Sequence, residues 1–180
     1  MNIIPTSISE VFLIEPKIFS DERGAFLESW NKKTFNDLGI AADFVQDNHS
    51  TSYKNVLRGL HYQIKHSQGK LVRAIIGEVY DVAVDLRKSS PTFGKWVGFT
   101  LSAHNNRMAW IPPGFAHGFY VTSSSAEFVY KTSEYWSPEH ERTLVWNDPS
   151  LDISWPLVGK PFLAPRDANG QLFSDLEFYA

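Results

Sequence analysis

Short segments of alternating apolar and polar residues follow one another along the chain, separated by turn-forming residues. The segments richest in β-branched and aromatic residues lie at 11–15, 25–30, 71–87, 95–101, 107–111, 117–123 and 127–136. The segment at 71–87 is long enough for two strands that meet near Gly77. Polar turns such as DERG at 21–24 and SAHNN at 102–106 lie between the segments. Many short strands at this spacing predict an all-β fold.

Helical signals are weak by comparison. NKKTFNDLG at 31–39 predicts one short helix that ends at its glycine, with Phe35 and Leu38 facing inward. The chain has no strand–helix alternation and no glycine-rich phosphate loop. We therefore expect one jelly-roll domain over 1–180, with a few short helices. Residues after about 155 are richer in Pro, Gly and polar side chains, so we expect a C-terminal extension packed on the barrel.

The composition narrows the classes of function. The 180 residues include 17 Lys and Arg against 20 Asp and Glu, and the net charge of −3 does not indicate a nucleic-acid or membrane-surface protein. The absence of cysteine excludes disulfides, zinc–thiolate sites and thiol catalysis. No segment is apolar over the length that spans a bilayer, and the N-terminus lacks the features of a signal peptide. We therefore expect a cytoplasmic protein.

Six histidines are the first candidates for chemistry: His49, His61, His66, His104, His117 and His140. Two or three ligands at strand spacing, such as HxH, would indicate a metal site in a barrel. No HxH or HxxxH pair occurs, so we expect no metal. Only His61 and His117 lie in aromatic, strand-like surroundings.

His61, in LRGLHYQ at 57–63, is the candidate general base. Arg58 precedes it and Lys70 follows, and two cations beside an imidazole keep it neutral and can stabilise an enolate. Strand alternation places Arg58 and His61 on opposite faces, so both can serve one site only if the strand has a bulge near Gly59. The alternatives are a packing role for His61 and a solvent-exposed position for the two cations.

Tyr130 is the candidate proton donor. It lies in EFVYKTSEYW, where a period of two places five side chains on one face: Phe128, Tyr130, Thr132, Glu134 and Trp136. A phenol can donate a proton, and an indole can stack on a ring. The alternative is an aromatic core stripe. His117 follows the rigid turn IPPG, and on its own it is interpreted as a structural residue.

Two further polar clusters suit an anionic or polar ligand. Arg23 lies at a turn, and the strand after it carries Phe26 and Glu28 on one face. A guanidinium matches the oxygens of a phosphate, although a turn arginine can equally be solvent-exposed. The second cluster comprises Gln46, Asp47 and Asn48. These side chains can hydrogen-bond a ligand or cap a turn.

A catalytic histidine is commonly oriented by a carboxylate. Asp167, in FLAPRD at 162–167, is one candidate for that role. Asp81 and Asp85 share a strand face and compete with it. The residue pattern leaves this choice open.

Seven segments occur in a fixed order: DERGAFLESW, FVQDNHS, LRGLHYQ, DVAVDLRKSSPTFGKW, IPPGFAHGF, YKTSEYWSPEHE and WNDPSLDISWPL. In this order they resemble the dTDP-4-dehydrorhamnose 3,5-epimerase family, over about 16–167 of the chain. The resemblance implies a cupin-type jelly roll, or double-stranded β-helix, that needs neither a metal nor a cofactor. It also implies a homodimer in which strands are exchanged between subunits.

The resemblance assigns a role to each candidate. His61 matches the proton acceptor and Tyr130 the proton donor, and Asp167 matches the carboxylate that pairs with the histidine. Arg58 and Lys70 match the cations around the keto oxygen. The residues that match substrate contacts are Arg23, Phe26, Glu28, Gln46, Asp47, Asn48, His117, Trp136, Glu141 and Arg166.

Three positions depart from the family pattern. Trp136 stands where a tyrosine commonly stacks on thymine, and an indole can stack at least as well. Arg166 stands where a lysine is common, so the charge is kept and the geometry of the donors differs. Ala164 replaces a frequent serine, and the sequence does not explain this change.

The implied substrate is dTDP-4-dehydro-6-deoxy-α-D-glucose, whose C4 ketone acidifies the hydrogens on C3 and C5. Inversion at both carbons gives dTDP-4-dehydro-β-L-rhamnose, in dTDP-L-rhamnose biosynthesis. The alternatives are a 3- or 5-mono-epimerase of a related dTDP-4-keto-deoxysugar, a non-catalytic carbohydrate-binding jelly roll and a metal-dependent cupin enzyme.

Overall fold

A computed structural model describes residues 1–180 of the chain. The strands, in chain order, are β1 (Asn2–Pro5), β2 (Phe12–Glu15), β3 (Ile18–Asp21), β4 (Gly24–Leu27), β5 (Gln46–Tyr53), β6 (Leu57–Gln63), β7 (Lys70–Ile76), β8 (Glu78–Asp85), β9 (Trp96–Ser102), β10 (Met108–Ile111), β11 (Phe115–Val121), β12 (Ser125–Thr132) and β13 (Glu141–Thr143). The helices are α1 (Lys32–Asp37), α2 (Pro165–Ala168) and a 3-10 turn, η1 (Phe173–Asp175). None of them has the length and apolar character that a membrane crossing requires.

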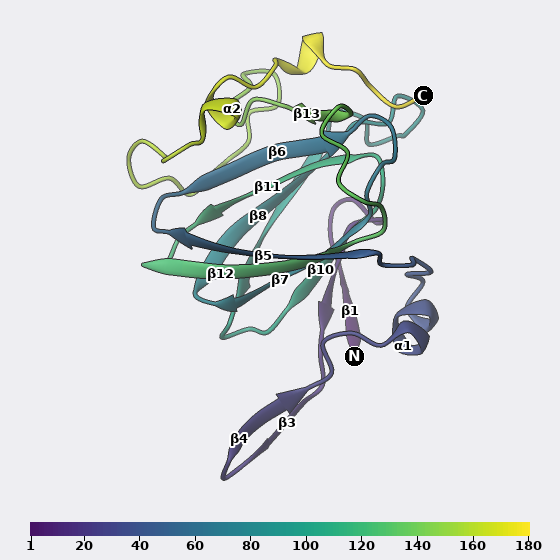
Figure 1. The fold of residues 1–180 in the computed structure, drawn as a ribbon, viewed down its shortest axis with the longest axis vertical. Helices are drawn as coiled ribbons and strands as arrows, with labels where there is room; N and C mark the ends of the chain where they lie inside the picture. Colours follow the sequence, from purple (N-terminus) through teal and green to yellow (C-terminus); the bar gives the residue numbers. More distant parts are fainter.

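Two antiparallel sheets face one another and form the body of the molecule (Figure 1). The six-stranded sheet has the order β1-β2-β10-β7-β12-β5, and the five-stranded sheet has the order β13-β6-β11-β8-β9. Strands that are neighbours in space are distant in sequence, as where β7 lies between β10 and β12. This arrangement is a jelly roll, so the fold predicted from the strand spacing is confirmed.

The largest apolar core lies between the two sheets. Val72 and Ala74 of β7 and Phe128 of β12 pack against Phe119 and Val121 of β11. Strand alternation explains the pattern, because every second residue faces the interior. The rings of Phe119 and Phe128 have centroids 4.4 Å apart. Burial of each phenylalanine side chain stabilises the fold by about 2–3 kcal/mol. This packing holds the two sheets together.

The C-terminal segment packs on the outer face of the five-stranded sheet. Leu176 belongs to a second apolar cluster with Tyr62 of β6. The Tyr62 hydroxyl donates a hydrogen bond to the Glu177 carbonyl at 2.7 Å. Earlier in the segment, Phe162 forms a parallel bridge with Val56, just before β6. These contacts bring α2 beside β6, as Figure 1 shows.

Several predicted element boundaries are confirmed. β7 and β8 separate at Gly77, as the long apolar segment indicated. α1 follows Asn31, whose side chain accepts hydrogen bonds from two backbone N–H groups and caps the helix. Phe35 of α1 is buried, as predicted, at 1% exposure.

The end of β12 differs from the prediction. The strand ends at Thr132, whose hydroxyl donates to the Glu134 carbonyl at 2.8 Å and so turns the chain. Glu134 and Trp136 therefore lie beyond the strand, and the prediction that they share a strand face with Tyr130 is wrong. Similarly, the strand predicted at 25–30 ends at Leu27.

β5 carries only a weak strand signal in its sequence, QDNHSTSY, because Asp47 and Asn48 are poor β-formers and the segment has no apolar alternation. It pairs with β12 along its whole length, from Gln46 opposite Thr132 to Tyr53 opposite Ser125. The partner strand therefore imposes the extended conformation. The polar cluster at 46–48 forms the start of this strand and does not cap a turn.

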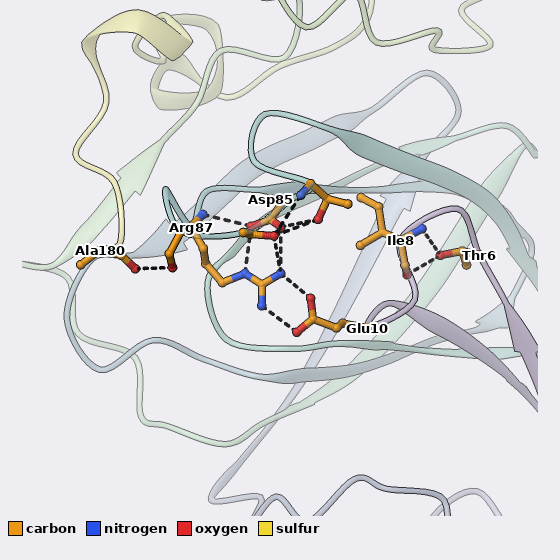
Figure 2. Close-up of polar contacts among 9 residues, drawn as sticks. Thr6, Ile8, Glu10, Asp85, Arg87 and Ala180 are labelled. Atoms are coloured by element: carbon orange, nitrogen blue, oxygen red, sulfur yellow. Dashed lines mark hydrogen bonds and ion pairs between the residues drawn. The ribbon is translucent and has the colours of Figure 1, made fainter.

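A network of charged and hydroxyl groups joins the N-terminal segment to the loop after β8 (Figure 2). Asp85 accepts hydrogen bonds from the Arg87 guanidinium at 2.8 and 2.9 Å, and from Ser90 and Thr92 at 2.6 and 2.7 Å. Arg87 also donates two bonds to Glu10, at 2.6 and 2.8 Å. Burial raises the pKa of Asp85, but these donors outweigh burial and lower the pKa to about 2. We call this network the Asp85–Arg87–Glu10 clasp.

Candidate active site

Polar side chains from both sheets gather in a pocket between them. The residues that line its inner part are Ser50, Arg58, His61, Lys70, His117, Gly118, Phe119, Phe128, Tyr130, Ala164, Arg166 and Asp167. An adjoining outer part adds Gln46, Asn48, Gln68, Trp136 and Glu141. The inner part thus brings together all five predicted catalytic residues: His61, Tyr130, Arg58, Lys70 and Asp167.

His61 is held by a carboxylate from the far end of the chain. Its Nε2 lies 2.6 Å from Oδ1 of Asp167, which belongs to α2. The carboxylate is 3% exposed and the imidazole 18% exposed, so the pair lies in the pocket wall with one edge of the ring accessible. A carboxylate can only accept, so Nε2–H donates and Nδ1 is left with a lone pair.

The other two candidate carboxylates have different partners. Asp81 lies 2.9 Å from His117, and Asp85 belongs to the clasp with Arg87. Both side chains are fully buried. The geometry thus resolves a choice that the residue pattern left open.

The bulge that the alternation of β6 required is present at Gly59. On β11 only one residue separates His117 from Phe119, whereas their partners on β6, His61 and Arg58, are three positions apart. Gly59 has φ of +108°, and a Cβ there would lie 2.7 Å from the Cα of Gly118. Only glycine fits this close approach, and the extra residue turns Arg58 and His61 toward one pocket.

Arg58 is positioned by β5. Its Nε donates to the Ser52 hydroxyl at 2.9 Å, and one terminal nitrogen donates to the Thr51 carbonyl at 3.3 Å. Ser52 is buried at 3% exposure. Arg58 is exposed, but these two bonds from the edge strand of the opposite sheet hold its guanidinium at the pocket.

Lys70, the first residue of β7, is 8% exposed. Burial lowers the pKa of its ammonium to about 8, and the charges of Glu141 and Asp81 oppose that effect. A lysine in this state still carries a proton at neutral pH. It can therefore stabilise a negative oxygen in the pocket.

Tyr130 lies on β12, in the sheet opposite His61. Burial raises the pKa of its hydroxyl, Glu141 raises it further, and Arg166 and Arg58 oppose the rise. The phenol is therefore protonated at neutral pH. The pocket thus has a base on one wall and an acid on the other.

The side chains of the pocket do not include a metal-binding cluster: no three His, Asp or Glu residues of the molecule are grouped so that they could hold an ion. The two pocket histidines instead each bond to one carboxylate, His61 to Asp167 and His117 to Asp81.

A sequence model described as dTDP-4-dehydrorhamnose 3,5-epimerase matches residues 5–175. The chain belongs to the dTDP-4-dehydrorhamnose 3,5-epimerase family. The epimerase of Pseudomonas aeruginosa is 58% identical to it over 174 residues, 96% of either chain. A crystal structure of dTDP-6-deoxy-D-glucose-3,5-epimerase from Legionella pneumophila, in complex with dTDP-4-keto-L-rhamnose, has a TM-score of 0.96 at 54% identity. It covers 98% of this chain and 94% of that one.

A solved structure of lower identity has a different stated activity. ChmJ, a 3′-monoepimerase from Streptomyces bikiniensis in complex with dTDP-quinovose, has a TM-score of 0.88 at 33% identity, covering 94% of this chain and 87% of that one. All of these epimerases share the fold of the present chain, and the predicted cupin-type jelly roll is confirmed.

Three residues that the sequence resemblance predicted to contact the substrate lie away from the pocket of their own chain. Arg23, Phe26 and Glu28 belong to or directly follow the β3–β4 hairpin, which projects from the sheets in Figure 1. Phe26 is 69% exposed, and the Arg23 guanidinium pairs with neighbouring Asp21. A single chain of this epimerase fold does not bring them to His61.

Two other predicted contacts lie at the margin. Asp47 faces outward on β5 and pairs with Lys131 at 2.6 Å. Trp136 is 55% exposed, and its backbone N–H donates to Gln46 at 3.0 Å. Trp136 therefore lines the outer part of the pocket from a loop held by β5.

The sequence interpretation missed several pocket residues. Ser50 and Gln68 line the pocket, and Ser52 holds Arg58. The signal for the serines was their alternation with Asn48, which places all three on one face of a strand. That signal is readable only once β5 is known to be a strand.

Proposed function

We propose that the chain inverts C3 and C5 of dTDP-4-dehydro-6-deoxy-α-D-glucose and so acts as an isomerase in dTDP-L-rhamnose biosynthesis. The observation that carries the proposal is the placement of His61, paired with Asp167, on one wall and Tyr130 on the other. Inversion of a carbon needs a base on one face of the sugar and an acid on the opposite face.

The first step is removal of the C3 proton. Nδ1 of His61 accepts that proton, and the electrons of the C–H bond move to the C4 oxygen, which becomes an enolate. Lys70 and Arg58 stabilise the oxyanion, while Asp167 stabilises the imidazolium that forms.

In the second step the enolate collapses and its carbon takes a proton from the Tyr130 hydroxyl on the other face. The phenolate then regains a proton from solvent and the imidazolium releases one, so the site is reset. The same sequence at C5 completes the conversion. The protons balance without a redox cofactor.

The nucleotide would lie in the outer part of the pocket. The Trp136 ring can stack on thymine, and Gln46 holds the Trp136 backbone while donating to Asn48 at 3.0 Å. Arg166, which pairs with Glu141 at 2.8 Å, is a nearby cation for the diphosphate.

A homodimer would complete the site. The hairpin exposes two large aromatic rings, Phe19 and Phe26, at 53% and 69%. Such rings on a projecting arm are normally covered by a partner. An arm that reaches the pocket of a second copy would supply Arg23, Phe26 and Glu28 there. The cytoplasmic location expected from the sequence stays a prediction.

The function is tested by incubating enzyme and substrate in deuterated water and locating the label by NMR. Deuterium at both C3 and C5 is the expected result. Deuterium at one carbon would instead indicate a mono-epimerase. Binding without any exchange would contradict the proposal and favour a carbohydrate-binding protein. Metal analysis of the purified active protein tests the metal-dependent alternative.

The roles of the two catalytic residues are tested with two variants. His61→Ala should lose at least about 10³-fold in exchange rate at both carbons, because no base remains. Tyr130→Phe should block inversion while exchange through His61 persists at C3. Circular dichroism serves as the folding control, and wild-type turnover in His61→Ala would refute the base assignment.

A further inference from the structure

A second imidazole–carboxylate pair lies in the pocket wall and has no part in the mechanism above. His117 of β11 donates from Nε2 to the two carboxylate oxygens of Asp81 on β8, at 2.9 and 3.0 Å. Asp81 is fully buried and His117 is 6% exposed. His117 is the cross-strand neighbour of His61, so the pair directly adjoins the proposed base.

Asp81 is an unfavourable residue for packing alone. Its neighbours on the inner face of β8 are Val79 and Ala83, which belong to the apolar core. Burial raises the pKa of Asp81, and the opposing effects come from His117 and Lys70. Replacement of a buried ionic group by an apolar one is often neutral or stabilising, so stability does not explain a carboxylate here.

Lys70 is the group that benefits from a buried negative charge. Only Glu141 and Asp81 favour its protonated form against the effect of burial. Glu141 is already paired with Arg166 at 2.8 Å, which offsets much of its charge. Burial lowers the pKa of His117, so the ring that donates to Asp81 is neutral at pH 7 and brings no full positive charge to the carboxylate.

We propose that Asp81 is a positioning residue for the reaction: it fixes the His117 ring in the wall of the pocket that also holds His61 and Lys70, and it supplies a buried negative charge behind that wall. The inference deepens the proposed epimerase function and rests on it. The titratable and charged groups that line the pocket with Lys70 are Arg58 and His61 of β6, His117 of β11, Tyr130 of β12, Glu141 of β13, and Arg166 and Asp167 of α2. Asp81 of β8 is bonded to His117 and lies outside the lining.

The direct test measures the protonation of Lys70 and does not depend on activity. Competitive labelling with acetic anhydride across pH, read by mass spectrometry of the Lys70 peptide, gives the pH at which the amine reacts half-maximally. Asp81→Asn should move this midpoint about one pH unit lower, because one unit charge nearby is lost. Glu78→Gln is the matched control, since Glu78 lies on the same strand outside the pocket, and its midpoint should equal that of the wild type.

Activity provides the second readout. In Asp81→Asn the alkaline limb of the kcat profile should shift lower by the same amount as the labelling midpoint. A midpoint that stays at the wild-type value overturns the inference whether or not the wild type catalyses exchange. Failure of exchange in the wild type, with the midpoint shifted as expected, would reject the epimerase function while the electrostatic link to Lys70 stands.

Asp81→Glu keeps the inference testable if the asparagine variant does not fold, as judged by circular dichroism. The longer carboxylate retains the charge and displaces His117. The labelling midpoint of Lys70 should therefore stay at the wild-type pH while turnover falls about tenfold. Wild-type turnover in Asp81→Glu would show that the position of His117 does not affect the reaction. A Lys70 labelling midpoint lowered by a full pH unit in the same variant would reject the electrostatic link between Asp81 and Lys70.

Discussion

At the scale of single residues, Lys70 combines a functional advantage with a cost to stability. Its folded-state pKa of about 8 lies below the value of 10.5 for a free lysine. The protonated amine is therefore destabilising in the folded protein at pH 7, by about 3 kcal/mol. This destabilisation is relieved as the pH rises from about 8 to 10.5.

Lys70→Met should consequently raise the free energy of unfolding at pH 7 by about 2–3 kcal/mol while abolishing turnover. Denaturant titrations at pH 7 and pH 10 provide the measurement, and the gain should shrink at the higher pH. Lys54→Met, at an exposed position, is the control and should change little. A destabilised Lys70→Met variant would contradict the argument.

Gly59 is the second residue at which a substitution should have a large effect, because only glycine fits there. Its added Cβ would meet Gly118 Cα and the His117 carbonyl, both at 2.7 Å, and both belong to backbone that cannot move aside. Gly59→Ala should therefore cost about 2 kcal/mol or more and separate Arg58 from His61, with loss of exchange.

Gly24→Ala is the matched comparison for that variant. Gly24 has φ of +130°, so it shares the backbone strain, but a Cβ there has open space. Thermal unfolding of the two variants isolates the clash at Gly59. Equal losses of stability would show that φ, and not the close approach of β6 and β11, sets the requirement.

Residue reasoning proposed His61 and Tyr130 for proton transfer but left the partner of His61 open. The pairing with Asp167 spans 106 residues, and no periodicity reports a contact of that range. By contrast, the bulge at Gly59 was predictable, since Arg58 and His61 cannot otherwise share a face. For Trp136 the period of two gave a wrong prediction. The strand ends at Thr132, whose hydroxyl donates a hydrogen bond to the Glu134 carbonyl and turns the chain.

At the scale of elements, the edge strands were hardest to predict. β5 is a strand because β12 pairs with it, and its polar sequence suits one face in the pocket and one in solvent. The β3–β4 hairpin has an apolar composition without a core of its own. Its residues can contribute to a substrate site only if the hairpin contacts a second copy of the chain.

Subunit complementation tests that role of the hairpin. Chains carrying Arg23→Ala with Glu28→Ala, and chains carrying His61→Ala, should each be inactive. When they are unfolded and refolded together, half of the dimers should be mixed, and each should hold one intact site. About one quarter of wild-type exchange activity should therefore return. No recovery, with mixed dimers verified by mass spectrometry, would mean that the hairpin acts within its own chain or not at all.

At the scale of the whole molecule, the Asp85–Arg87–Glu10 clasp ties the N-terminal segment to the loop after β8. The pKa of Asp85 is lowered in the folded state, to about 2 from 3.8. Its contribution to stability, about 2 kcal/mol, is therefore complete above pH 4 and lost as the pH falls through 2.

Asp85→Asn should accordingly be less stable than the wild type by about 2 kcal/mol at pH 7. The difference should narrow below pH 4 and vanish below pH 2, where the wild-type carboxyl also becomes neutral. Urea titrations at several pH values provide the comparison. A difference that is independent of pH would mean that packing, and not the charge of Asp85, stabilises the clasp.

The late position of Asp167 in the chain has a consequence for biosynthesis. A ribosome makes the barrel strands first, from β1 to β13, and Asp167 follows the last of them. Until that later segment is made, His61 has no carboxylate to hold its tautomer, because its partner lies 106 residues further along the chain. The barrel strands can therefore pair before the His61–Asp167 contact exists, and that contact forms only when the segment after β13 docks on β6.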